Sequence, residues 1–187
     1  MNRLNSIAFG AMTLLVSASM AMGPTPANAK QPPGKGEYYI APLGGIIIDH
    51  VGGEKIEILG QTAGGGFTAF GAGVGVAFGI PVAPKIVLEP EFTVGGLSKN
   101  LGDFETLTGN VLFFFPGSGR MMPYFASGLG LAHAGGTDFF IQFGGGFDAF
   151  DLTPKVSMRL DGRVGISFDP TSTSFRFGAM FVIPLTK

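Results

Sequence analysis

The sequence contains no cysteine, and this absence excludes several classes of protein. The chain can have no disulfide framework, no thiolate metal ligands and no cysteine to acylate as in a lipoprotein. Charged residues are scarce, at 13% of 187 residues, and the formal net charge is only −1. The chain therefore has no basic field for nucleic acid and too few surface charges for an ordinary soluble domain.

Long apolar runs are also missing beyond the N-terminal segment. No later stretch is an uninterrupted apolar span of helical membrane length, which argues against a helical membrane protein. Convincing helical periodicity is absent as well. Glycine and phenylalanine are abundant instead, at 32 and 19 residues. This combination is unusual for a soluble core, but it suits a membrane barrel with small residues inside and aromatic residues outside.

Residues 1–29 have the features of a cleaved secretory signal peptide. Arg3 supplies a positive start, 7–22 is a mostly apolar run, and Ala27-Asn28-Ala29 is a small-x-small cleavage pattern. A transmembrane anchor is the alternative, but the run is short and its far flank is rich in proline. We expect an exported protein with a single domain, residues 30–187, that begins at Lys30 after cleavage.

Eight segments after residue 36 alternate with period two, which indicates β-strands. In the clearest one, Val156 to Ile166, apolar residues occupy one face and Arg159, Asp161 and Arg163 occupy the other. The first segment is ambiguous, because the residues from Tyr38 to Leu43 do not show which face of the strand is apolar. The eight predicted strands are about 37–49, 65–80, 85–95, 104–115, 123–134, 139–151, 156–166 and 174–185.

The distribution of polarity over these strands predicts the fold class. Every strand has one apolar face, and in six of the eight the other face is small or polar. A soluble barrel would place its large apolar residues inside and its charges outside. An apolar exterior around a polar interior is the membrane-barrel pattern, and closure leaves no unpaired strand edge in lipid. We predict an all-β protein, an eight-stranded antiparallel up-and-down transmembrane β-barrel.

The predicted connections alternate between compact and longer ones. Compact turns at Pro81–Pro84, Pro116–Gly119 and Leu152–Pro154 fit the periplasmic side, together with both termini. The longer or more polar connections fit the exterior. These are 49–63, 97–103, 135–138 and 167–173.

Four strand motifs resemble the small outer-membrane β-barrel domain family of OmpA/OmpX-type and opacity-type proteins. The resemblance covers about Tyr38 to Leu185 and implies the barrel fold in the bacterial outer membrane, but no single activity. One departure is that the chain ends Pro184-Leu185-Thr186-Lys187, whereas such barrels usually end on an aromatic residue. We also expect no cell-wall-binding domain after the barrel. The motifs are Asn110–Phe115, Pro123–Gly130, Gly144–Asp148 and Phe175–Gly178.

The sequence offers little for catalysis or metal binding. A hydrolase needs a nucleophile and a base within hydrogen-bond reach. His133 faces outward by parity, and Ser127 lies about 20 Å away along the same strand. His50 begins the longest loop near Asp49, Glu54 and Glu57, where a divalent-cation site competes with the more ordinary solvated loop. The glycine runs lack the lysine and helix of a phosphate loop. We expect no catalytic, cofactor or metal site.

The charged residues of inward parity form the candidate site, a structural charge network in the lumen. In a ring of eight strands the third and seventh face each other, so Glu89 and Glu91 should look across at Arg159 and Arg163. A turn between Thr153 and Pro154 places Asp148 opposite Arg159 on the neighbouring strand. The set balances four acids against four bases, and buried charges persist only when they are paired. Its members are Lys85, Glu89, Glu91, Asp148, Arg159, Asp161, Arg163 and Arg176.

These observations favour a structural or interaction protein of the cell envelope, not an enzyme. A small solute pore is the first alternative and a lipid-modifying outer-membrane enzyme the second. The interior of eight strands is just wide enough for side chains, and inward Phe114, Tyr124, Phe140 and Phe150 help to fill it. The expected partners are outer-membrane lipid, lipopolysaccharide and the barrel-assembly machinery. We expect a monomer that binds no nucleic acid and no cofactor.

Overall fold

The structure is a computed structural model. Its described residues contain ten β-strands. The described residues are 31–34, 36–51, 56–58, 61–63, 67–98, 102–117, 121–134, 136–153, 156–168 and 171–185. The predicted signal peptide and cleavage site lie outside these ranges. No helix in the described ranges is long and apolar enough to span a bilayer. Eight long strands form the barrel: β1 (Tyr39–Val51), β4 (Phe67–Ala83), β5 (Ile86–Leu97), β6 (Asp103–Phe114), β7 (Met122–His133), β8 (Thr137–Thr153), β9 (Val156–Phe168) and β10 (Thr171–Pro184).

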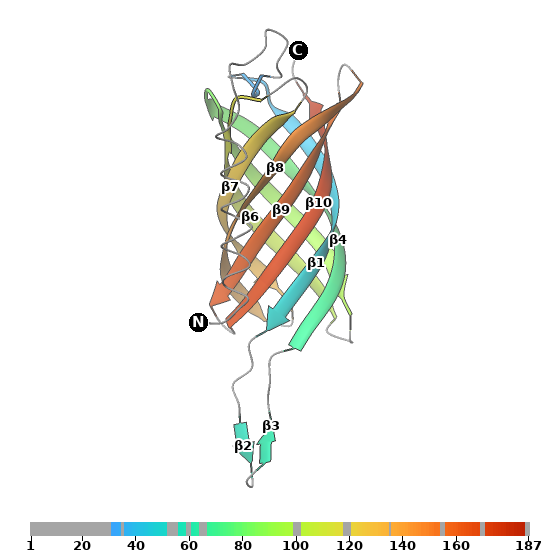
Figure 1. The fold of residues 1–187 in the computed structure, drawn as a ribbon, viewed down its shortest axis with the longest axis vertical. Helices are drawn as coiled ribbons and strands as arrows, with labels where there is room; N and C mark the ends of the chain where they lie inside the picture. The colour runs from blue at the N-terminus through green and yellow to red at the C-terminus, as the bar shows by residue number, and fades with distance from the viewer. Residues whose placement is uncertain are drawn as a thin grey trace.

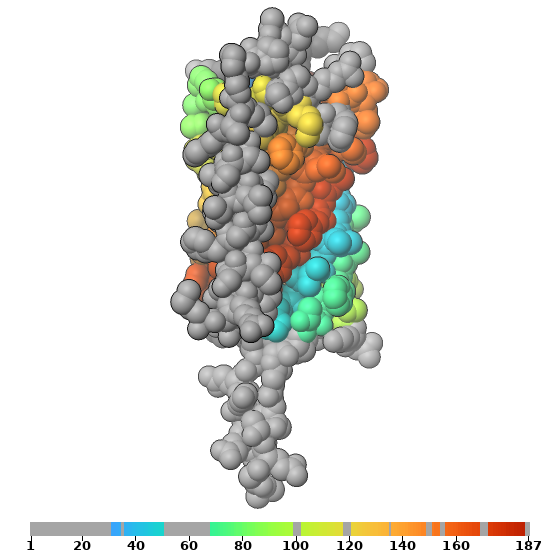
Figure 2. All heavy atoms as spheres, viewed as in Figure 1, coloured from blue at the N-terminus to red at the C-terminus, as the bar shows by residue number. Residues whose placement is uncertain are grey.

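The eight long strands close into a single barrel with the order β1-β10-β9-β8-β7-β6-β5-β4 (Figure 1). Every neighbouring pair is antiparallel, and β1 completes the ring by pairing with both β10 and β4. The visible parts of β9, β10, β1 and β4 form a continuous wall in Figure 2. The predicted eight-stranded antiparallel up-and-down barrel is confirmed, and none of its eight strands presents a free edge.

The two ends of the barrel differ in their connections. At one end, here named the turn end, lie the connections β4–β5, β6–β7 and β8–β9; the opposite end is named the loop end. Between β1 and β4 the chain contains a hairpin of β2 (Ile56–Ile58) and β3 (Gln61–Ala63), drawn beyond the loop end in Figure 1. The sequence had predicted this segment only as a loop.

Two predicted connections are wrong in their position. The expected loop 167–173 is largely strand, because β9 continues to Phe168 and β10 begins at Thr171, with Ser167 paired to Ser172. The expected turn at Pro81–Pro84 is strand through Ala83, and the pairing shifts register between Pro81 and Ala83. Backbone pairing continues through these residues in both places, so the polar residues and Pro81 do not end the strands.

Burial alternates along the strands with the predicted polarity. On β5, for example, Val87, Glu89 and Glu91 are buried, and Leu88 and Pro90 between them are exposed. Large apolar residues cover the outer surface, and three of them, Val74, Leu107 and Leu129, are 57–62% exposed. The period of two therefore places apolar side chains outside and charged ones inside the same barrel.

The first strand, ambiguous in sequence, turns Tyr39, Ala41 and Leu43 into the lumen, where each is at most 8% exposed. Tyr39 lies opposite Gly79 on β4. A Cβ atom at Gly79 would lie 2.0 Å from the Tyr39 ring, so only glycine leaves room for this ring. Gly79 of β4 thus complements the bulky side chain that its neighbour β1 turns into the lumen.

Candidate functional site in the lumen

The lumen divides into three layers from the turn end to the loop end. The first layer, the apolar plug, is a cluster of buried apolar residues at the turn end. It joins residues from six strands. The plug consists of Tyr39, Ala41, Leu43, Ala77, Val87, Leu112, Phe114, Met122, Tyr124, Ala126, Met180 and Val182.

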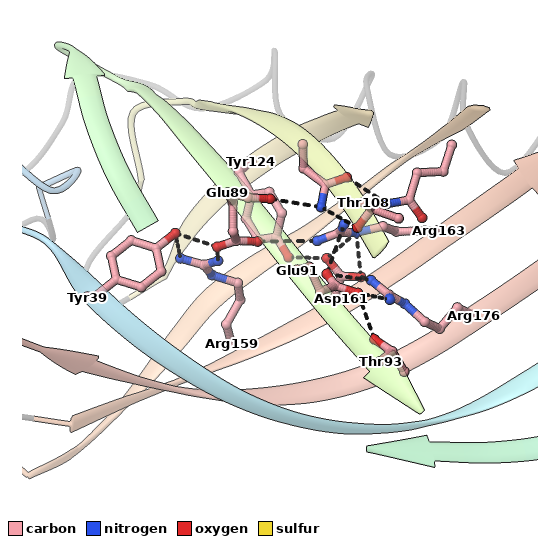
Figure 3. Close-up of polar contacts among 12 residues, drawn as sticks. Tyr39, Glu89, Glu91, Thr93, Thr108, Tyr124, Arg159, Asp161, Arg163 and Arg176 are labelled. Carbon is pink, nitrogen blue, oxygen red and sulfur yellow. Dashed lines mark hydrogen bonds and ion pairs between the residues drawn. The ribbon is translucent and has the colours of Figure 1, made fainter. Parts of the chain in front are cut away.

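The second layer, the charge belt, has Glu89 on β5 at its centre. Glu89 is fully buried and accepts hydrogen bonds from three donors that reach it across the lumen (Figure 3). Arg159 Nη1 donates at 2.6 Å and Arg163 Nη2 at 3.4 Å, and both come from β9, diametrically opposite in the ring. The Tyr39 hydroxyl of β1 is the third donor. One carboxylate therefore ties three strands together.

Glu91, two residues further along β5, forms the second node of the belt. Both terminal nitrogens of Arg176 on β10 donate to its carboxylate, with Nη2 at 3.1 Å. Arg163 Nη1 lies 3.3 Å away, and the Thr93 hydroxyl donates at 3.1 Å. This two-pronged contact is the strong geometry for an arginine and a carboxylate.

Asp161 on β9 forms the third node and links the belt to the plug. The Tyr124 hydroxyl donates to its Oδ2 at 2.5 Å, and Arg163 Nε lies 2.9 Å from its Oδ1. Arg176 Nη2 approaches to 3.5 Å. Arg163 therefore touches all three carboxylates, Glu89, Glu91 and Asp161, as Figure 3 shows.

Arg159 lies at the boundary between belt and plug and is completely buried. Its guanidinium carbon lies 5.1 Å from the ring centres of Tyr39 and Tyr124 and 5.6 Å from that of Phe114. Its Nη2 also donates to the Tyr39 hydroxyl at 3.1 Å. Aromatic rings around a desolvated guanidinium add cation–π attraction to the ion pair with Glu89.

The structure brings six of the eight predicted lumen residues into one connected cluster. Asp148 is also buried, and it pairs in register with Arg159 on the neighbouring strand. Lys85 is different: its side chain is exposed and it occupies the tight turn between β4 and β5, with a left-handed φ of 69°. The expected balance of four acids and four bases is therefore wrong, because the turn removes Lys85 from the lumen. The connected six are Glu89, Glu91, Arg159, Asp161, Arg163 and Arg176.

Uncharged polar residues that sequence reasoning did not connect complete the belt. Asn110 Nδ2 donates to the Glu89 carbonyl at 3.1 Å and to the Thr108 hydroxyl at 3.2 Å. Gln142 Nε2 donates to Asn110 Oδ1 at 2.6 Å. Their inward parity was readable from the alternation of their strands. Tyr39 of β1, which donates to Glu89, had no such signal, because the sequence of its strand does not show which face is apolar.

The third layer, the vestibule, is a cavity of about 150 Å³ at the loop end. Two belt residues, Arg163 and Arg176, form part of its wall on the side of the belt. Two aromatic residues, Phe104 and Phe140, and two carboxylates, Asp49 and Asp138, also line it. Hydroxyl groups from several strands complete its surface. The lumen is therefore filled at the turn end and hollow at the loop end.

The ring of each histidine contacts a threonine hydroxyl on a neighbouring strand. His50 Nδ1 lies 3.1 Å from the Thr68 hydroxyl, and His133 Nδ1 lies 3.1 Å from that of Thr137. His133 is exposed, in line with its outward parity. In the described ranges no group of three or more histidines and carboxylates is placed to hold a metal ion.

Fold and lumen together define a closed eight-stranded β-barrel with an apolar surface and an ionic interior. A solved structure of this class, the crystal structure of Neisserial surface protein A (NspA), is similar at a TM-score of 0.56 and 13% sequence identity. The similarity covers 78% of this chain and 96% of NspA. No family model matches the sequence, and no curated protein matches it. The comparison therefore supports the fold.

Proposed function

We propose that this protein is an integral barrel of the bacterial outer membrane with a structural or interaction role in the envelope. The proposal rests on the apolar exterior and the charged interior of the barrel, which are the reverse of what a soluble protein shows. The large apolar residues that point outward could not be covered by any other part of the described barrel, and hydrocarbon is the solvent that suits them. The shared fold with NspA and the resemblance to OmpA/OmpX-type and opacity-type barrels support the same location.

A non-catalytic and poorly conducting barrel fits the lumen best. The apolar plug and the charge belt fill the half of the bore nearest the turn end. Both would have to move before a solute could pass through the barrel. Each histidine ring contacts a threonine hydroxyl, but among the described residues neither ring forms a hydrogen bond with a carboxylate that would orient it as a general base. Lipid, lipopolysaccharide and the assembly machinery are the partners that an integral barrel of this kind requires.

Fractionation of cells that express the full chain tests this proposal. We expect the protein in the outer membrane, shortened by the 29 residues of the signal peptide, as the mass of the purified protein will show. Unboiled and boiled gel samples should migrate differently, because a closed barrel resists detergent until it is heated. Recovery as a soluble periplasmic protein without detergent would overturn the proposal.

A further inference from the structure

The vestibule contains two carboxylates that the charge belt does not neutralise. Asp49 on β1 and Asp138 on β8 both line the cavity. Neither forms an ion pair within the described part of the chain. The backbone N–H of His50 donates to the Asp49 carboxylate, but Oδ1 of this carboxylate is buried without a hydrogen-bond partner. A buried carboxylate oxygen without a donor is costly, so this atom marks a position where a bound donor would stabilise the protein.

The arginines in the same wall are already engaged. Arg176 makes its two-pronged contact with Glu91, and Arg163 is shared among three carboxylates. Only 13% of the Arg176 side chain is exposed, and 1% of that of Arg163. An anion in the vestibule would therefore compete with buried ion pairs for its counter-charge.

The belt and the vestibule together contain six carboxylates and three guanidinium groups. The acids are Glu89, Glu91, Asp49, Asp138, Asp148 and Asp161, and the bases are Arg159, Arg163 and Arg176. A narrow bore with low-dielectric walls focuses the field of such an excess and concentrates ions of opposite sign. The excess is negative, so the favoured ion is a cation.

The cavity also has the size and surface for an organic cation. Phe104 and Phe140 line it from β6 and β8. Aromatic rings attract ammonium groups by cation–π interaction, most strongly for quaternary ammonium groups that hold water weakly. A cavity of 150 Å³ is comparable to one that accommodates benzene, so it fits a ligand with a small number of heavy atoms.

We propose that the vestibule is a binding site for a small organic cation, a quaternary ammonium or protonated amine. Asp49 and Asp138 supply the counter-charge, and Phe104 and Phe140 contact the apolar groups on the cation. The belt below closes the site, so that the ligand enters and leaves through the loop end. This site is additional to the envelope role and does not depend on it.

Three probes of similar shape and different charge test the proposal on the purified full-length barrel in detergent micelles. These are choline, its neutral analogue 3,3-dimethylbutan-1-ol, and the anion 3,3-dimethylbutanoate. Titration calorimetry or NMR shifts of the barrel should show saturable binding of choline that is at least about tenfold tighter than that of the alcohol. The anion should bind more weakly than either.

Variants then locate the site. Asp49→Asn and Asp138→Asn should each weaken choline binding about tenfold and leave the weak binding of the alcohol unchanged. Phe140→Leu should weaken choline more than the alcohol. Asp103→Asn is the matched control, because Asp103 is exposed on the outer rim of the same end and does not line the vestibule. Choline binding by this control should equal that of wild type.

Three results would overturn the proposal. These are equal affinity of choline and the alcohol, tighter binding of the anion, and the absence of saturable choline binding by the folded barrel. The heat-dependent gel shift verifies that each variant is folded. The comparison of the three probes needs only the wild-type protein, so it decides the question even if a variant does not fold.

Discussion

Arg159 on β9 and Glu89 on β5 form an ion pair across the full width of the barrel, at 2.6 Å, and neither side chain is exposed to solvent. Their strands are diametrically opposite in the ring. The pair therefore restrains the bore in a direction that no backbone hydrogen bond spans, because ladder bonds join only neighbouring strands.

Replacement of the arginine tests how much this restraint stabilises the barrel. Arg159→Met should lower the free energy of unfolding by about 3–5 kcal/mol, because it leaves buried Glu89 without its nearest cation. Adding Glu89→Gln should recover part of the loss, since the stranded charge is removed as well. Adding Asp148→Asn instead should recover less, because the ion pair of 2.6 Å is with Glu89. Urea unfolding in detergent micelles measures all four proteins.

Lys85→Met is the matched control for this series. Lys85 belonged to the predicted network but is exposed in the β4–β5 turn, so its loss should change the free energy of unfolding by less than about 0.5 kcal/mol. A hydrated lumen in which each pair contributes only about 0–1 kcal/mol is the competing view. An Arg159→Met variant as stable as wild type would favour that view over a stabilising network.

The alternation of the strands was enough to predict the inward positions of the charge belt. Arg159, Asp161 and Arg163 stand at every second position of β9, and a ring of eight strands places β5 opposite. Both features depend only on a period of two and on the number of strands. The same reasoning misplaced Lys85, because it continued the parity of β5 one residue into a turn.

Other features of the lumen could not be read from local patterns. Tyr38 and Tyr39 are adjacent and chemically alike, so polarity could not decide which ring turns inward. The decision depends on space, because Gly79 on the neighbouring strand leaves room for the Tyr39 ring. The vestibule is assembled from residues on different strands, and its volume depends on packing that no single segment encodes.

The fit between Gly79 and Tyr39 leads to a second prediction. Gly79→Ala should lower the free energy of unfolding by about 1–3 kcal/mol, because the new methyl group overlaps a buried ring that also donates to Glu89. Gly109→Ala is the control, since a Cβ atom there meets nothing within 4 Å. Urea unfolding of both variants should show a loss for the first alone. Equal stabilities would mean that Tyr39 can move aside freely.

Planar-bilayer recordings test the closure of the bore. The wild-type protein should show no large, steady single-channel currents, because the plug and belt leave no continuous wide water path. The charge belt lies between the vestibule and the turn end in the described part of the barrel, so the vestibule by itself does not conduct. Steady currents from the purified, heat-modifiable protein would refute this prediction and favour the solute pore.

Two outward valines on β4 provide a test of the solvent around the barrel. Val74 lies near the middle of the strand and is 62% exposed, whereas Val82 lies near the turn end and is 47% exposed. In a bilayer an outward arginine costs about 2–4 kcal/mol at the midplane and about 0–1 kcal/mol near the interface. Val74→Arg should therefore lower the free energy of unfolding from lipid vesicles several times as much as Val82→Arg does.

The same pair of variants separates a membrane barrel from a water-soluble one. In water, an arginine at either exposed position would change stability little, by about 0.5 kcal/mol or less, because its charge stays hydrated. The comparison is internally matched, since both changes replace valine by arginine on one face of one strand. Nearly equal stabilities of the two variants in vesicles would show that depth does not matter at these positions. The apolar surface around Val74 would then require a covering other than hydrocarbon.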